Sequence, residues 1–176
     1  MRYKEISLRE FDQYASGMFS ILASNMLLIH PEESVAEDDF TAWKTYQQEH
    51  FSEKTFIVFE DGGTLAGYFQ YSLRDHDFFI EEIEIRPDYQ VRYNILGSLL
   101  RFVRDSTPDH ITTLSAYINK DNPRSYRVAE TLGLSVVSES ASGKSLLYSG
   151  DIRRLLNRNS DSAKAEHNQE NGETSA

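Results

Sequence analysis

Two carboxylates in the middle of the chain have a spacing that allows shared chemistry. Glu82 and Glu84 belong to the run FFIEEIEI at residues 78–85, which is typical of a β-strand. Because side chains alternate across a strand, both glutamates are expected on one face, and Glu81 on the other. Neighbouring carboxylates raise each other's pKa, so one of them could act as a general base or dock a cation near neutral pH. A solvated strand face is the alternative interpretation.

Several other kinds of site are excluded or not indicated by the sequence. The chain has no Cys, which excludes disulfides, thiolate metal sites and a cysteine nucleophile. Its five histidines show no ligand spacing, so no metal site is predicted. There is no Gly-x-Ser-x-Gly elbow, and the SGKS at 142–145 lacks the earlier glycine of a P-loop. We therefore expect no covalent enzyme intermediate.

Composition and charge indicate one acidic domain followed by a tail. The 176 residues include 28 acidic and 18 basic side chains, which gives a net charge of −10 at pH 7. Such a surface repels nucleic acid and suits a cationic small molecule such as an amine. No apolar run is long enough to span a membrane, and the start lacks a signal-peptide core, so a cytoplasmic location is expected. Residues 156–176 are polar and aperiodic, which predicts a disordered tail after a domain at 1–155.

Hydrophobic periodicity predicts alternating helices and strands before that tail. Apolar spacings of three and four predict helices at 8–28, 37–51, 93–104 and 123–132. Runs of β-branched and aromatic residues predict strands at 3–7, 55–60, 64–73, 78–85, 111–118, 134–139 and 144–150. The order β-α-α-β-β-β-α-β-α-β-β predicts a mixed α/β fold with helices on both faces of the sheet.

Two local motifs within this order resemble those of the GNAT superfamily of acyl-CoA-dependent N-acyltransferases. The first is IEIRPDYQ at 83–90, and the second is INKDNPRS at 118–125, followed by Leu-Gly-Leu at 132–134. The resemblance covers about residues 1–151. It implies a mostly antiparallel, twisted sheet of about seven strands that is splayed in the middle. It also implies direct transfer of an acetyl group, or another acyl group, from acetyl-CoA to a primary amine of a small molecule or a protein.

The resemblance further implies a role for each motif in binding the co-substrate. The backbone of Ile83 and Ile85 would bond the pantetheine amides, as an added strand does. Asn122 matches the residue that reaches the pantetheine arm, and Ser125 lies one helical turn further on. A loop that opens a helix would supply amides for the pyrophosphate. The residues of that loop are Gln90, Val91, Arg92, Tyr93, Asn94, Ile95 and Leu96.

The pyrophosphate loop departs from the family pattern. The family usually has glycine at the position of Tyr93 and glycine or alanine at that of Ile95, and glycine lets the backbone approach a phosphate closely. Arg92 and Asn94 are candidates to compensate, by charge and by tolerance of left-handed geometry. The missing glycines leave open a second function, a GNAT-like domain that has lost catalysis and binds a ligand or a protein.

The proton donor for the leaving thiolate is a second departure. Many members have a tyrosine seven residues after the asparagine, where this chain has Ala129. Tyr126 lies close to the same helix face and is a candidate substitute; ordinary helix surface is the alternative.

The acceptor amine is expected between the first two helices and the sheet. Four aromatic residues there either line a pocket or belong to the core: Phe19, Trp43, Phe69 and Tyr71. Pairing of two copies through the last strands is common in the fold, which leaves a homodimer open.

Overall fold

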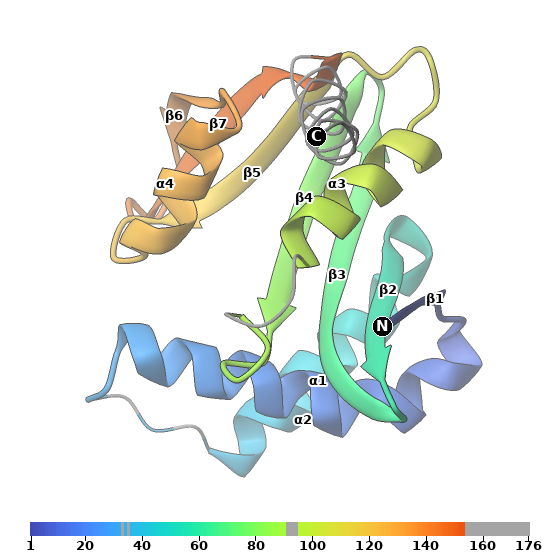
Figure 1. The fold of residues 1–176 in the computed structure, drawn as a ribbon. Coiled ribbons are helices and arrows are strands. Elements are labelled where there is room, and N and C mark those ends of the chain that lie inside the picture. The colour runs from blue at the N-terminus through green and yellow to red at the C-terminus, as the bar shows by residue number, and fades with distance from the viewer. Residues whose placement is uncertain (33, 35, 91–94, 154–176) are drawn as a thin grey trace, which may run out of the picture. The chain divides into compact units, whose positions relative to one another are not determined.

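The computed structural model describes residues 1–153 except 33, 35 and 91–94 (Figure 1). It confirms the predicted order of elements and the mixed α/β fold, with most boundaries within two residues. The predicted tail lies outside the described residues. In chain order the elements are β1 (Arg2–Glu5), α1 (Leu8–Ile29), α2 (Glu37–Glu49), the 3-10 helix η1 (Phe51–Glu53), β2 (Thr55–Asp61), β3 (Thr64–Arg74), β4 (Asp77–Ile85), α3 (Ile95–Ser106), β5 (Thr113–Asn119), α4 (Pro123–Thr131), β6 (Ser135–Glu139) and β7 (Ser145–Asp151).

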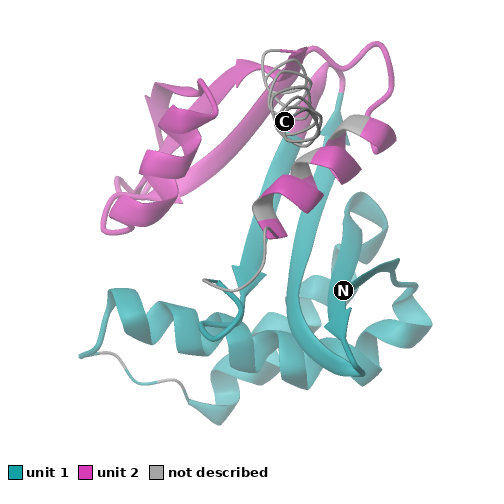
Figure 2. Ribbon diagram, viewed as in Figure 1, with its two compact units in different colours: residues 1–74, 79–93 teal, residues 75–78, 94–176 magenta. Residues whose placement is uncertain are grey.

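The seven strands form one sheet in the order β1-β2-β3-β4-β5-β7-β6. The pairs β1–β2, β2–β3, β5–β7 and β6–β7 are antiparallel. The chain divides into two compact units, one of residues 1–74 and 79–93 and the other of 75–78 and 94–176 (Figure 2). The first unit therefore holds α1, α2, β1 to β3 and most of β4. No helix among the described residues is long and apolar enough to cross a membrane.

In the first unit, α1 and α2 cover one face of β2 and β3 (Figure 1). Phe11, Ala15 and Met18 follow the helical spacing of α1 and are at most 1% exposed. They pack against Phe56 of β2 and Tyr68 of β3. Burying one such large apolar side chain stabilises the fold by about 1.5–3 kcal/mol. This core fixes the face of β3 that carries the polar residues described below.

Glycines determine two features of β3. Gly62 and Gly63 have φ of +56° and +83°, so the β2–β3 turn places both central residues in the left-handed region, as a type I′ hairpin requires. Gly67 matters for a different reason. A Cβ at Gly67 would overlap the carbonyl oxygen of Glu84 and lie 3.1 Å from Cα of Ile85. The backbones of β3 and β4 therefore approach closely at the end of β4.

In the second unit, the N-terminus of α4 is capped. Asn122 is the N-cap, and its Oδ1 accepts a hydrogen bond from the backbone N–H of Ser125 at 3.1 Å. Pro123 occupies the first helical position, and Gly133 ends the segment with φ of +83°. These contacts set the position of the predicted INKDNPRS motif at the start of a helix.

Candidate active site

Glu82 is held by two polar side chains of the neighbouring strand β3. Its Oε2 accepts hydrogen bonds from the Tyr68 hydroxyl at 2.8 Å and from Nε2 of Gln70 at 2.9 Å. Both donors are 1% exposed, whereas Glu82 itself retains some contact with solvent. Burial raises the pKa of Glu82 to about 7, although Tyr68 and Lys54 favour its charged form. The group can therefore exchange a proton near neutral pH.

Glu84 is held by a hydrogen bond from helix α1. Nδ2 of Asn25, on α1, donates to its Oε2 at 2.5 Å. Burial raises the pKa of Glu84 to about 8, and the charge of Glu82 adds to that increase, while Asn25 opposes it. Glu82 contacts Tyr68, whose side chain packs against α1, so both carboxylates face the α1 side of the sheet.

The prediction that Glu81 points to the opposite face is wrong. Its Oε1 accepts hydrogen bonds from Oγ of Ser72 at 2.8 Å and from Arg74 at 2.6 Å. Ser72 lies two residues after Gln70 on β3, hence on the face that Glu82 contacts. Two consecutive residues share a face only where strand alternation is interrupted, as at a β-bulge. The interruption brings Glu81, Glu82 and Glu84 to one face.

Gln90 and Asn25 both bind the backbone carbonyl at the end of β4. The Ile85 oxygen accepts from Nε2 of Gln90 at 2.7 Å and from Nδ2 of Asn25 at 3.1 Å. Gln90 also donates to Oδ1 of Asn25 at 3.3 Å. A carbonyl oxygen has two lone pairs, and both have side-chain donors here. A pantetheine amide that used this oxygen would have to displace one of them.

The remaining predicted residues belong to other parts of the chain. Residues 91–94, which include four of the predicted pyrophosphate-loop residues, lie outside the described residues. Ile95 and Leu96 begin α3, and Ile95 is 2% exposed. In the second unit, the backbone N–H of Tyr126 donates to the Asn122 carbonyl at 3.3 Å, within the first turn of α4. Among the described residues no cluster of His, Asp and Glu could hold a metal ion.

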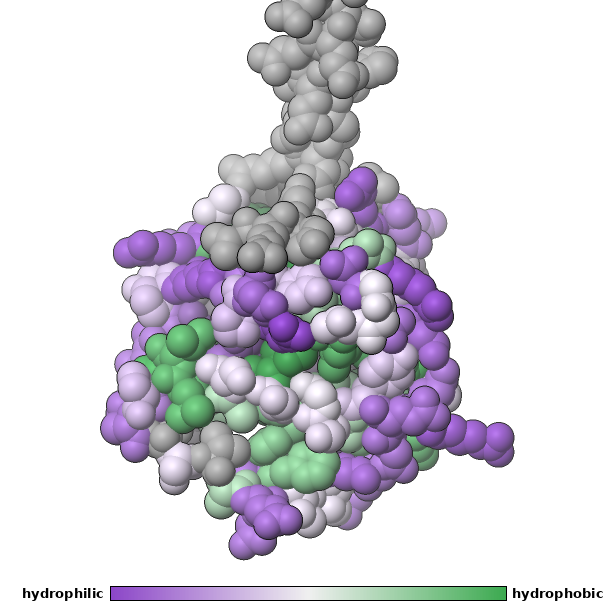
Figure 3. Space-filling view, turned by 60° about the horizontal axis from the view of Figure 1, so that its bottom comes forward, coloured by the Kyte–Doolittle hydropathy of each residue, from purple (hydrophilic) through white to green (hydrophobic). Residues whose placement is uncertain are grey.

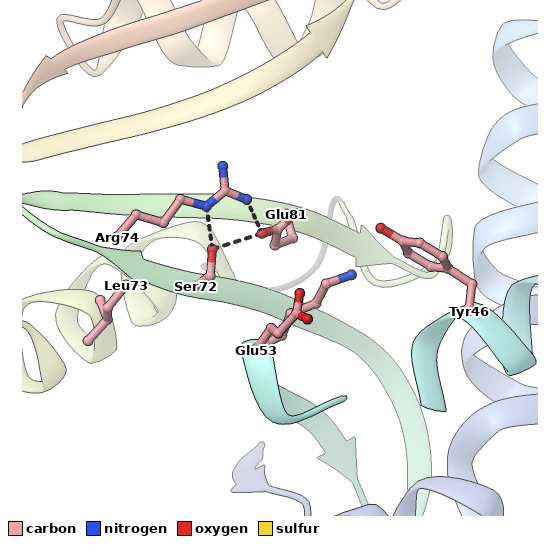
Figure 4. A pocket seen from close by; sticks show the side chains of 7 residues that line it. Tyr46, Glu53, Ser72, Leu73, Arg74 and Glu81 are labelled. Atoms are coloured by element: carbon pink, nitrogen blue, oxygen red, sulfur yellow. Dashed lines mark hydrogen bonds and ion pairs between the residues drawn. The ribbon is translucent and has the colours of Figure 1, made fainter. Parts of the chain in front are cut away.

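A cavity of about 290 Å³ opens beside Glu81 in the first unit (Figure 4). Nζ of Lys54 lies 4.7 Å from the centroid of the Tyr46 ring and donates to Oε1 of Gln47 at 3.3 Å. Arg74 projects into the same space, where Figure 4 shows its contacts with Ser72 and Glu81. The lining residues are Tyr46, Glu53, Lys54, Ser72, Leu73, Arg74 and Glu81.

Of the four aromatic residues expected near the acceptor, Phe69 and Tyr71 are buried, whereas Phe19 and Trp43 are half-buried. Phe19 packs against Trp43 with ring centroids 5.6 Å apart. Phe69 and Tyr71 stack on each other at 5.4 Å and are at most 7% exposed. None of the four lines the cavity beside Glu81, nor a second one of about 350 Å³ between α1 and the β2–β3 turn.

Apolar side chains also reach the surface of the molecule. Figure 3 shows them in patches among polar residues. Exposed apolar residues of the chain include Met26, Leu27 and Leu28 in the last turns of α1, and Leu28 is 66% exposed.

Comparisons with known proteins place the chain among acetyltransferases. Residues 17–134 match a family model described as "Acetyltransferase (GNAT) family". No curated protein matches the chain.

Solved structures of similar fold include three N-acetyltransferases or acetyltransferases at low identity. One is the PaiA N-acetyltransferase of Thermoplasma acidophilum in complex with coenzyme A, with a TM-score of 0.62 and 10% identity over 85% of this chain and 98% of that one. An acetyltransferase of Thermus thermophilus gives 0.65 and 16%, over 86% and 97%. Mutant forms of the spermidine/spermine N-acetyltransferase SpeG of Vibrio cholerae give 0.59 and 11%, over 90% and 97%. At these identities the likeness shows the fold.

Proposed function

Since the chain belongs to the GNAT acetyltransferase family, we propose that it transfers an acetyl group from acetyl-CoA to a primary amine by direct attack in a ternary complex. The family match supports an acyltransferase. The coenzyme A complex and the spermidine/spermine enzyme among the similar structures support acetyl-CoA as the donor and a small amine as the acceptor. A protein amine remains a second acceptor class.

The observation that carries this proposal is the position of Glu82, whose Oε2 is held by the Tyr68 hydroxyl and Gln70 Nε2 on a partly buried strand face, where burial raises its pKa to about 7. An amine must be neutral to attack, and Glu82 in its charged form can accept the proton that the amine loses. A C–N bond then forms at the thioester carbon, the C–S bond breaks, and the CoA sulfur leaves with a proton from a donor. Tyr126 is the candidate donor. Glu84, with a pKa of about 8, is mostly protonated at pH 7, so Glu82 is the better base there.

The test combines binding with activity. Calorimetric titration with acetyl-CoA is expected to show micromolar affinity, and an amine panel is expected to release free CoA thiol. Glu82→Gln should keep acetyl-CoA binding and lose about 100-fold or more in kcat, the usual contribution of a general base. Glu49→Gln, an exposed glutamate on α2, is the control and should change neither.

Two results would contradict the proposal. An absence of acetyl-CoA binding up to millimolar concentration would favour the alternative, a domain that has lost catalysis and binds a ligand or protein. Unchanged kcat in Glu82→Gln would remove Glu82 as the base and leave Glu84 to be tested in the same way.

A further inference from the structure

The Lys54 ammonium is held in place by neutral groups. Gln47, whose carbonyl oxygen accepts from Nζ, is 5% exposed, and Nζ lies 4.7 Å from the centroid of the Tyr46 ring. Among the described residues, Lys54 forms no ion pair, although the chain as a whole carries a net charge of −10. Other lysines do find acidic partners, namely Lys4 with Glu10, Lys44 with Asp12 and Lys120 with Glu139. The cavity therefore contains a positioned cation with spare donors.

The other charges of the cavity leave room for an anion at Lys54. Glu81 is already paired with Arg74 at 2.6 Å. Glu53 is exposed and forms no ion pair among the described residues. Lys54 also lowers the pKa of Glu82, so the two groups interact electrostatically. Glu81, which precedes Glu82 in the chain, lines the same cavity as Lys54, so a ligand whose acidic group contacts Lys54 would have its other end near the proposed base.

We propose that this cavity binds the acidic group, a carboxylate or a phosphate, of an acceptor amine, with the Lys54 ammonium as its main contact. The inference rests on the proposed acetyl transfer and narrows its substrate from amines in general to amines that carry an acid. The cavity of about 290 Å³ has the liquid volume of roughly ten water molecules, which suits a ligand of amino-acid size. Simple diamines, which carry no acid, are then the poorer substrates.

Matched acceptors test the inference directly. Lysine and cadaverine differ only in the carboxylate, and phosphoethanolamine and ethanolamine differ only in the phosphate. We expect kcat/KM to favour the acid-bearing member of at least one pair by roughly tenfold or more, because a site built for a polar group discriminates against analogues that lack it. Preference in the first pair identifies a carboxylate, and preference in the second a phosphate.

Variants connect that preference to the cavity. Lys54→Met should abolish the preference, since it removes the cation, whereas Glu53→Gln should increase it, since it removes a competing negative charge. Lys44→Met is the matched control, because Lys44 lies on α2 outside the cavity and pairs with Asp12. It should leave the preference unchanged. The readout is the ratio of kcat/KM for the two acceptors of a pair. An effect of Lys54 on the pKa of Glu82 would change both kcat/KM values alike, so it cancels in this ratio and only acceptor recognition remains.

The inference and the proposed function fail in different ways. Acetylation of cadaverine and ethanolamine without any preference for their acid-bearing partners would overturn the inference and leave the transferase intact. A preference that survives Lys54→Met would also overturn it. Calorimetric titration with lysine and with cadaverine measures the affinity of the cavity for each amine without any transfer step. If acetyl-CoA does not bind, that titration still decides the inference, since equal or absent binding of the two amines contradicts it.

Discussion

Removing the Tyr68 hydroxyl tests whether Glu82 sets the pH dependence of the reaction. The hydroxyl donates to Oε2 of Glu82 at 2.8 Å and favours the charged carboxylate, so Tyr68→Phe should raise the pKa of Glu82 above about 7. A hydrogen bond to a charged group contributes about 1.5–3 kcal/mol, and about 1.4 kcal/mol corresponds to one pKa unit. Gln70 still donates to the same oxygen, so we expect a shift of about one unit.

The assay is the pH profile of kcat/KM, measured by release of CoA thiol. At pH 7 the charged fraction of Glu82 falls from about one half to about one tenth, so activity should fall about fivefold and recover above about pH 9. Tyr71→Phe, on the same strand but without a contact to Glu82, is the control and should leave the profile in place. An unshifted profile in Tyr68→Phe, or an equal shift in both variants, would refute the assignment of Glu82 as base.

Two further predictions concern stability. The pKa of Glu84 is raised from 4.5 to about 8 in the folded protein, so its contribution is fully favourable below about pH 4.5 and is lost as the pH rises through about 8. At pH 9, Glu84→Gln should therefore increase the free energy of unfolding by up to a few kcal/mol relative to wild type, which thermal melting would detect as a higher melting temperature. At pH 5 the increase should be much smaller. An effect that does not depend on pH would contradict the burial of this charge. Gly67→Ala should destabilise the protein by about 1–3 kcal/mol, because the methyl group meets the backbone of Glu84, whereas Gly17→Ala meets only the Leu65 side chain and should be neutral or stabilising. Equal denaturation midpoints for the two alanine variants would argue against a close β3–β4 approach.

The fold could be predicted from the sequence because its signals are local. Helical spacing such as that of Phe11, Ala15 and Met18 indicates one buried helix face. Each helix predicted from such spacing is present, with boundaries within about two residues of those expected. The glycine pair at 62–63 is also a local signal, because both positions of the β2–β3 turn have positive φ, which glycine adopts readily.

The partners of the carboxylates could not be predicted in the same way. Asn25 and Glu84 are 59 residues apart, and nothing in either local sequence indicates their hydrogen bond. Gln70 and Ser72 did carry a signal, because they are alternate polar residues within the mostly apolar run between Leu65 and Leu73. Glu81 was misplaced because strict alternation was assumed, and an interruption within β4 depends on pairing with β3 rather than on residue type.

The interruption in β4 also explains how one strand can serve two tasks. With strict alternation, Glu81 and Glu82 would face opposite sides of the sheet, and a cavity beside one would be remote from the other. With the interruption, the ion pair of Glu81 with Arg74 forms one wall of the cavity, while Glu82 next to it keeps neutral donors and a pKa near 7. Lys54 already lowers the pKa of Glu82, and a charged hydrogen-bond partner in place of the neutral donors would lower it further and weaken Glu82 as a base. The separation of the two environments would therefore allow the proposed acceptor recognition and the proposed proton transfer to lie side by side on one face.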